Sequence, residues 1–168
     1  MSESGGQVPP KARYFEDYAV GEVFEFGEYV VDEQELVEFG RAYDPQPFHT
    51  DAEAARKTHF GGLIASGWHT CSMLMRLMVD NYISPAASLG SPGIDQIRWT
   101  QPVRPGDRLN ARATVVETRR SRSKPDRGLV RTDYEVYNQQ RELVMTMSSM
   151  GLFKCRGGEN HPAISESA

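Results

Sequence analysis

Residues 68–81 read Trp68-His69-Thr70-Cys71-Ser72-Met73-Leu74-Met75-Arg76-Leu77-Met78-Val79-Asp80-Asn81. Apolar side chains occur on nearly every side of the helix that this run predicts, which indicates a helix buried inside the protein rather than one lying on its surface. Its methionines would suit an adaptable ligand wall, although a methionine-rich core is the simpler interpretation. The run therefore predicts a central helix that the rest of the chain has to cover.

Four strands predicted in the last third of the chain can supply that cover. They are residues 94–100, 108–115, 129–137 and 142–153. In the second and third strands alternate residues share a buried side: Leu109, Ala111, Ala113 and Val115, then Val130, Thr132, Tyr134 and Val136. Such alternation is typical of a sheet with one buried and one wetted face. The connections are short, so the strands are expected to pair antiparallel.

An earlier strand and helix complete the predicted fold. Residues 23–31 are rich in β-branched and aromatic side chains and predict a strand. Asp32 with Glu35 resembles a capping box and predicts a helix over residues 33–42. The fold class is therefore α+β, with a curved antiparallel sheet wrapped around one long central helix.

A loop stiffened by two prolines, Asp44-Pro45-Gln46-Pro47-Phe48-His49, carries a carboxylate and an imidazole at its two ends. Fully extended, at roughly 3.1 Å per residue, it would hold them about 15 Å apart. Two groups that share one water therefore require a bend near Phe48. Thr50 or Asp51 can cap a helix from Ala52, and a place just before that N-terminus favours a neutral imidazole. Asp44 and His49 can then divide base and acid roles, the alternative being a turn with an incidental histidine.

Length and composition bound the class of protein. The 168 residues suffice for one domain, predicted over residues 12–155, between disordered tails at 1–11 and 156–168. The net charge of −4 offers no broad basic face for nucleic acid or an anionic membrane. Arginines gather between Arg119 and Arg127. We expect a solvated hairpin loop there, with contact to a phosphate as the alternative.

The cysteines and histidines predict neither a disulfide framework nor a metal centre. Cys71 and Cys155 suit a reducing compartment. The chain shows no signal peptide and no apolar run long enough to span a membrane, so a cytoplasmic protein is expected. His49, His59 and His69 match no common zinc spacing, and no metal or other cofactor is expected.

Three motifs together resemble the MaoC-like family of hot-dog-fold proteins, which includes the R-specific enoyl-CoA hydratases. They are residues 43–49 (Tyr43-Asp44-Pro45-Gln46-Pro47-Phe48-His49), residues 64–67 (Ile64-Ala65-Ser66-Gly67) and residues 101–107 (Gln101-Pro102-Val103-Arg104-Pro105-Gly106-Asp107). The resemblance extends from about Tyr14 to Phe153. Three positions depart from the family's pattern: Tyr43 replaces a small residue, Gln46 replaces an asparagine and Phe48 replaces an aliphatic residue.

The resemblance implies a water-addition reaction on an acyl thioester. Asp44 and His49 would hold one water against a trans-2-enoyl thioester, one removing its proton during attack on C3 and the other delivering a proton to C2. Gly67, at the start of the central helix, would offer its backbone N–H to the developing enolate oxygen. The reverse reaction would dehydrate a 3-hydroxyacyl thioester.

Three further residues are expected to contact the substrate or support the pair. Gln46 would hold the Asp44 carboxylate or contact the thioester, and Ser66 would orient the loop or the water. Together with Tyr43 and Gln46, Phe48 would reshape the acyl pocket, which argues against a straight-chain fatty enoyl substrate.

The thioester would be carried by coenzyme A or by an acyl-carrier protein, and the family resemblance together with an unpaired sheet edge implies a homodimer. Two alternatives remain for the activity. One is an acyl-CoA thioesterase, and the other is an acyl-CoA-binding subunit without catalysis. A thioesterase would release free thiol, whereas a hydratase would not.

Overall fold

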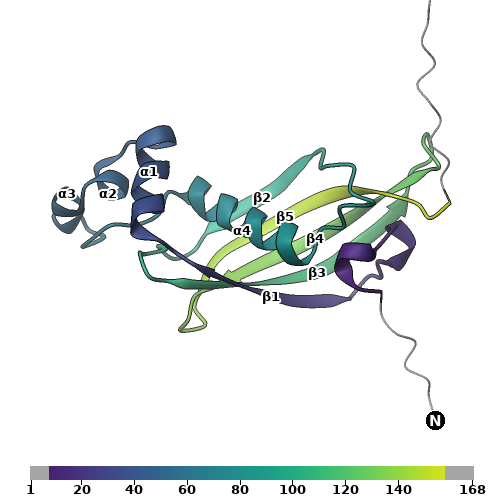
Figure 1. The fold of residues 1–168 in the computed structure, drawn as a ribbon, viewed down its shortest axis with the longest axis horizontal. Coiled ribbons are helices and arrows are strands. Elements are labelled where there is room, and N and C mark those ends of the chain that lie inside the picture. The colour runs from purple at the N-terminus through teal and green to yellow at the C-terminus, as the bar shows by residue number, and fades with distance from the viewer. Residues whose placement is uncertain (1–7, 158–168) are drawn as a thin grey trace, which may run out of the picture.

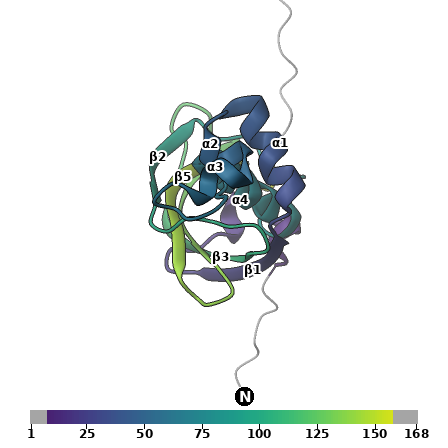
Figure 2. The same ribbon diagram turned by 90° about the vertical axis from the view of Figure 1, so that its left-hand side faces the viewer.

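A computed structural model describes residues 8–157 of the chain. Its elements, in chain order, are η1 (Pro10–Ala12), η2 (Phe15–Asp17), β1 (Val23–Val30), α1 (Glu33–Tyr43), α2 (Pro47–Thr50), α3 (Ala52–Arg56), α4 (Gly67–Asn81), β2 (Gly93–Trp99), β3 (Arg108–Arg120), β4 (Arg127–Tyr137) and β5 (Leu143–Lys154). The expected strand–helix order is confirmed, with the sheet curved around α4 (Figures 1 and 2).

The five strands form one antiparallel sheet in the order β1-β3-β4-β5-β2. The hairpins β3–β4 and β4–β5 join neighbours in the sequence, whereas β2 crosses over to pair with β5. The register places Ala113 opposite Tyr134, and Tyr134 opposite Met147. All three side chains are buried, so the alternation in the sequence marks the face that covers α4.

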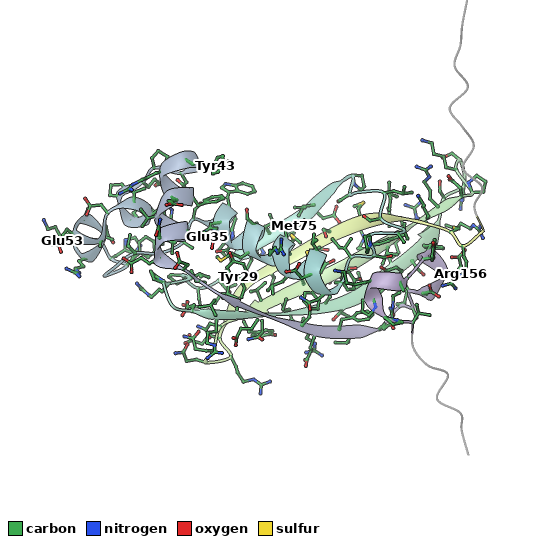
Figure 3. All side chains as sticks on the ribbon, viewed as in Figure 1. Tyr29, Glu35, Tyr43, Glu53, Met75 and Arg156 are labelled. Atoms are coloured by element: carbon green, nitrogen blue, oxygen red, sulfur yellow. The ribbon has the colours of Figure 1, made fainter. Side chains whose placement is uncertain are left out.

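The long helix α4 begins one residue earlier than predicted, at Gly67, and ends at Asn81. Its Met73, Leu74 and Leu77 are almost fully buried and belong to the main hydrophobic cluster. The expectation that α4 is buried all round is wrong, however: the exposed fractions are 60% for Trp68, 48% for Met75 and 45% for Val79. The sheet curves around one side of the helix only (Figure 2), and Met75, labelled in Figure 3, is among the residues that remain exposed.

An ion pair anchors the N-terminal segment to the sheet. Arg13 is almost fully buried and makes two hydrogen bonds of 2.8 Å to the Glu22 carboxylate, while its guanidinium lies 4.5 Å from the Phe24 ring centroid. Residues 1–11 were expected to be disordered, but a 3-10 turn forms over Pro10–Ala12. At the other end Arg156 pairs with Asp17. Residues 1–7 and 158–168, where the rest of both expected tails falls, lie outside the described residues.

Three short helices extend beyond one end of the sheet (Figure 1). The helix α1 begins as predicted, because the Asp32 side chain accepts a hydrogen bond of 2.9 Å from the Glu35 N–H. Asp51 caps α3 in the same way. At the opposite end of the molecule the arginine-rich segment forms the β3–β4 hairpin, as predicted. The labelled side chains Glu53 and Arg156 mark these two ends in Figure 3.

Candidate active site

The loop between Asp44 and His49 bends, as expected for two groups that share one water, because residues 47–50 form the single turn of α2. Asp44 ends α1 as its C-cap residue, and Pro47 occupies the first turn of α2, where its missing N–H costs nothing. The turn brings His49 back toward the end of α1. As a result His49 Nε2 lies 3.2 Å from Asp44 Oδ2.

Two further donors hold the Asp44 carboxylate. Gln46 Nε2 donates to Oδ1 and the Ser66 hydroxyl donates to Oδ2, each at 2.7 Å. These hydrogen bonds, with a smaller contribution from His49, hold the pKa of Asp44 below its usual value although partial burial opposes them. Asp44 is therefore an anion at neutral pH, fixed by three neighbours.

The His49 ring is oriented from its other side. Its Nδ1 lies 2.7 Å from the Ile64 carbonyl oxygen, and because a carbonyl only accepts, Nδ1 carries a hydrogen. The ring is buried, with the Phe48 ring against it at a centroid distance of 4.6 Å. His49 belongs to the single turn of α2 and also stands two residues before Asp51, the N-cap of α3, as the sequence predicted. Its Nε2 faces the Asp44 carboxylate.

Gly67 is the first residue of α4, where a helix leaves its backbone N–H groups without intrahelical partners. A Cβ at this position would lie 2.5 Å from Cε2 of Trp99. The Trp99 indole Nε1 in turn donates to the Gly67 carbonyl oxygen at 3.0 Å. Glycine is thus needed for the close approach of the indole to the start of the helix.

A cavity of about 380 Å³ brings several of the predicted residues together. It is lined by Asp44, Phe48, His49, Phe60, Ile64, Ala65, Gly67, Trp68, Thr70, Trp99, Thr100, Gln101, Pro102 and Val103. Asp44, His49, Gly67 and Phe48 therefore share one cavity. Gln46 and Ser66 are not in its lining, and both contact the Asp44 carboxylate instead.

Sequence reasoning missed most of the aromatic lining. Trp68 and Trp99 pack edge to face at a centroid distance of 5.8 Å, and Phe48 packs against Phe60 at 5.2 Å. Two of these residues stand beside recognised motifs: Trp68 directly follows Gly67, and Trp99 shortly precedes residues 101–107. Their places next to these motifs could have marked both tryptophans as site residues. That the two rings meet, however, depends on the pairing of β2 with β5.

The remaining histidines lie elsewhere. His69 is buried in α4 and stacks on Phe39 at 4.7 Å, and His59 is exposed on the loop after α3. Within residues 8–157 no group of three or more His, Cys, Asp or Glu side chains is arranged to hold a metal ion. No helix in the same part of the chain is long and apolar enough to cross a membrane.

A carboxylate, an imidazole and a helix-start N–H around one apolar cavity are groups that can transfer protons and bind an oxyanion. The fold that carries it is a helix wrapped by an antiparallel sheet. Residues 16–139 match the family described as MaoC like domain. The chain belongs to this family and has its hot-dog fold.

Solved structures agree with this assignment. A MaoC-like dehydratase from Rhodospirillum rubrum is 38% identical with a TM-score of 0.80, over 86% of this chain and 99% of that one. A monoamine oxidase regulatory protein from Archaeoglobus fulgius is 32% identical with a TM-score of 0.76, over 86% and 96%. The R-hydratase PhaJ1 from Pseudomonas aeruginosa has a TM-score of 0.70 over 85% and 86%, and at 24% identity it shows the fold alone.

Proposed function

We propose that the protein is a hydro-lyase that adds water to a trans-2-enoyl thioester, or removes it from a 3-hydroxyacyl thioester. One observation carries the proposal: Asp44 Oδ2 and His49 Nε2 lie 3.2 Å apart in the lining of a cavity that also contains Gly67. Two titratable groups at this separation can both reach one water molecule. The similarity to a MaoC-like dehydratase supports the same reaction class.

The two side chains would divide the proton transfers. In hydration, the water oxygen bonds to C3 while one member of the pair takes its proton. The C2–C3 π electrons move toward the thioester oxygen, and C2 then takes a proton from the other member.

Gly67 would stabilise the enolate oxygen. Its N–H belongs to the first turn of α4, where the helix dipole favours negative charge. The Trp99 indole packs against Gly67 and donates to its carbonyl oxygen, which restrains the residue that carries this N–H before substrate binds. A donor that is already oriented costs no reorganisation during the reaction, and losing one such donor elsewhere reduces the rate about 10²–10³-fold.

We further propose that the protein is a cytoplasmic homodimer. Its substrates would be thioesters of coenzyme A or of an acyl-carrier protein. Trp68, Met75 and Val79 expose apolar surface along α4, and the edge strand β2 adds Ile94, which is 49% exposed. The outer edge of β2 pairs with no other strand among the described residues. A second copy would cover both features.

The direct test is an assay with trans-2-butenoyl-CoA. Hydration removes the ultraviolet absorbance of the conjugated thioester without releasing thiol. We expect Asp44→Asn and His49→Ala each to reduce kcat/KM about 10²–10⁴-fold. The matched control is Asp80→Asn, which should retain activity because its carboxylate pairs with exposed Arg76 on the far half of α4. Thiol release would instead identify a thioesterase, and thioester binding without turnover would identify a binding subunit.

A further inference from the structure

Two cavities lie along the same helix–strand pair. The catalytic cavity uses the beginning of α4 (Gly67, Trp68) and the end of β2 (Trp99). A second cavity, of about 500 Å³, uses the second half of α4 and the beginning of β2, with Met75, Met78, Val79, Ile83 and Ile94 in its lining. The helix α4 and the strand β2 run past both, so the two cavities follow one another along this pair of elements.

The side chain of Trp99 lines the catalytic cavity and does not line the second one. Its indole lies against Gly67 and contacts the Cys71 thiol, one helical turn further along α4. Cys71 Sγ in turn lies 3.7 Å from Met145 Sδ, and Met145 is the residue directly opposite Trp99 in the β2–β5 register. Cys71 stands on α4 between Thr70, which lines the first cavity, and Met75, which lines the second. Its contacts with Trp99 and Met145 therefore lie between the two cavities. The hydrogen bond from Trp99 Nε1 to the Gly67 carbonyl holds the indole in this position.

A cationic side chain lies next to Phe60, which lines the catalytic cavity. Beyond Phe60 and Val103 the exposed Arg104 donates from Nη2 to the Phe60 carbonyl oxygen at 2.6 Å. Among residues 8–157 it forms no ion pair with a carboxylate, so its charge is available to a ligand. A phosphate-bearing thioester carrier fits this cationic side chain. The apolar acyl group then points the other way, toward Trp99.

We propose that Trp99 is a specificity-determining residue that restricts the enzyme to short acyl groups. Its indole ends the acyl pocket and keeps longer chains out of the second cavity. This inference rests on the proposed hydratase function and adds the class of its substrate, a short-chain enoyl thioester. A pocket that excludes or admits one methylene discriminates about 10–200-fold.

The test compares two substrates in three proteins. The ratio of kcat/KM for trans-2-octenoyl-CoA to that for trans-2-butenoyl-CoA is measured in the wild type, Trp99→Ala and Trp99→Phe. We expect Trp99→Ala to raise this ratio at least about tenfold, because it joins the two cavities. Trp99→Phe lacks the indole N–H but retains a ring, so the ratio should stay within about threefold of the wild type.

A second measurement uses the wild type alone and does not depend on the folding of a variant. Each buried methylene tightens binding about fourfold, so four more methylenes would tighten it by two orders of magnitude if they had room. Octanoyl-CoA should therefore inhibit less than about tenfold more tightly than butanoyl-CoA.

The outcomes separate this inference from the proposed function. Absence of hydration with every enoyl thioester would remove the function, and the inference with it. Hydration with an unchanged ratio in Trp99→Ala, or with an equal rise in Trp99→Phe, would overturn the inference alone. Octanoyl-CoA binding that is tighter than butanoyl-CoA binding by more than about tenfold would overturn it as well.

Discussion

The hydrogen bond from Ser66 to Asp44 offers a clean perturbation of the site. The Ser66 hydroxyl donates to Asp44 Oδ2 at 2.7 Å, and Ser66 has no exposed surface. Although Ser66 is the N-cap residue of α4, its side chain makes no capping hydrogen bond. The substitution Ser66→Ala therefore removes a donor to the carboxylate without uncapping the helix.

The expected cost follows from the charge and exposure of the acceptor. Hydrogen bonds to charged groups contribute about 1.5–3 kcal/mol. The Asp44 side chain is 22% exposed, so water replaces part of the lost bond. We therefore expect the lower end of this range, about 1.5 kcal/mol. For a chain of this length that corresponds to a fall in Tm of roughly 3–6 °C.

A double-mutant cycle tests whether the stability lost in Ser66→Ala comes from its hydrogen bond to Asp44. The free energy of unfolding in urea at pH 7 is measured for the wild type, Ser66→Ala, Asp44→Asn and the double variant. Because asparagine still accepts a neutral hydrogen bond, the expected coupling is about 1 kcal/mol. The matched control is Ser72→Ala, which removes a hydroxyl bonded to the Trp68 carbonyl on the exposed side of the same helix. Its cost should stay within about 0.5 kcal/mol.

Two results would refute this reasoning. One is a coupling below about 0.3 kcal/mol, which is within the error of additivity for independent sites. The other is a cost for Ser66→Ala no greater than that for Ser72→Ala. Either would mean that the Ser66 hydroxyl does not stabilise the charged form of Asp44.

Three further predictions concern the same chain. The hydrogen bonds that lower the pKa of Asp44 stabilise the folded state above about pH 4, and this stabilisation is lost as the pH falls through the folded-state pKa. The cost of Asp44→Asn, measured by urea unfolding, should therefore be smaller at about pH 3 than at pH 7. A cost that does not change with pH would contradict this prediction. Gly67→Ala places a methyl group against Trp99 and should destabilise by about 1–3 kcal/mol in thermal unfolding. Trp99→Ala should remove that penalty, and additive effects would argue against the contact. Arg13→Met takes the buried guanidinium from the Glu22 carboxylate, which is 12% exposed, and should cost about 3–5 kcal/mol in urea. A cost below about 1 kcal/mol would show that the pair contributes little.

Local signals predicted the helices and strands well. The Asp32 cap predicted the start of α1, and Asp51 was one of two predicted caps for α3. Alternation placed Leu109 and its neighbours on the buried face of β3. Each of these features depends on residues within a few positions of one another, and short-range hydrogen bonds and side-chain periodicity are visible in a sequence.

The candidate site was predictable only in part. The bend at Phe48 followed from the need to bring Asp44 and His49 together, and α2 supplies it. The contact from Ser66 to Asp44 joins residues far apart in the chain and had no local signal. The same holds for the close approach of Trp99 to Gly67.

The amino-acid sequence by itself determined which segments form helices and strands, which strand faces are apolar, and which residue types with proton-transfer chemistry stand in one stiff loop. Only the tertiary structure decided that β2 pairs with β5 rather than with β3, and that α4 keeps an apolar side uncovered. The physical reason is that patterns of neighbouring residues record local hydrogen bonding and burial, whereas the choice among strand partners depends on the packing of the whole chain. That choice is what brings Trp99 to the start of α4 and sets the shape of the cavity.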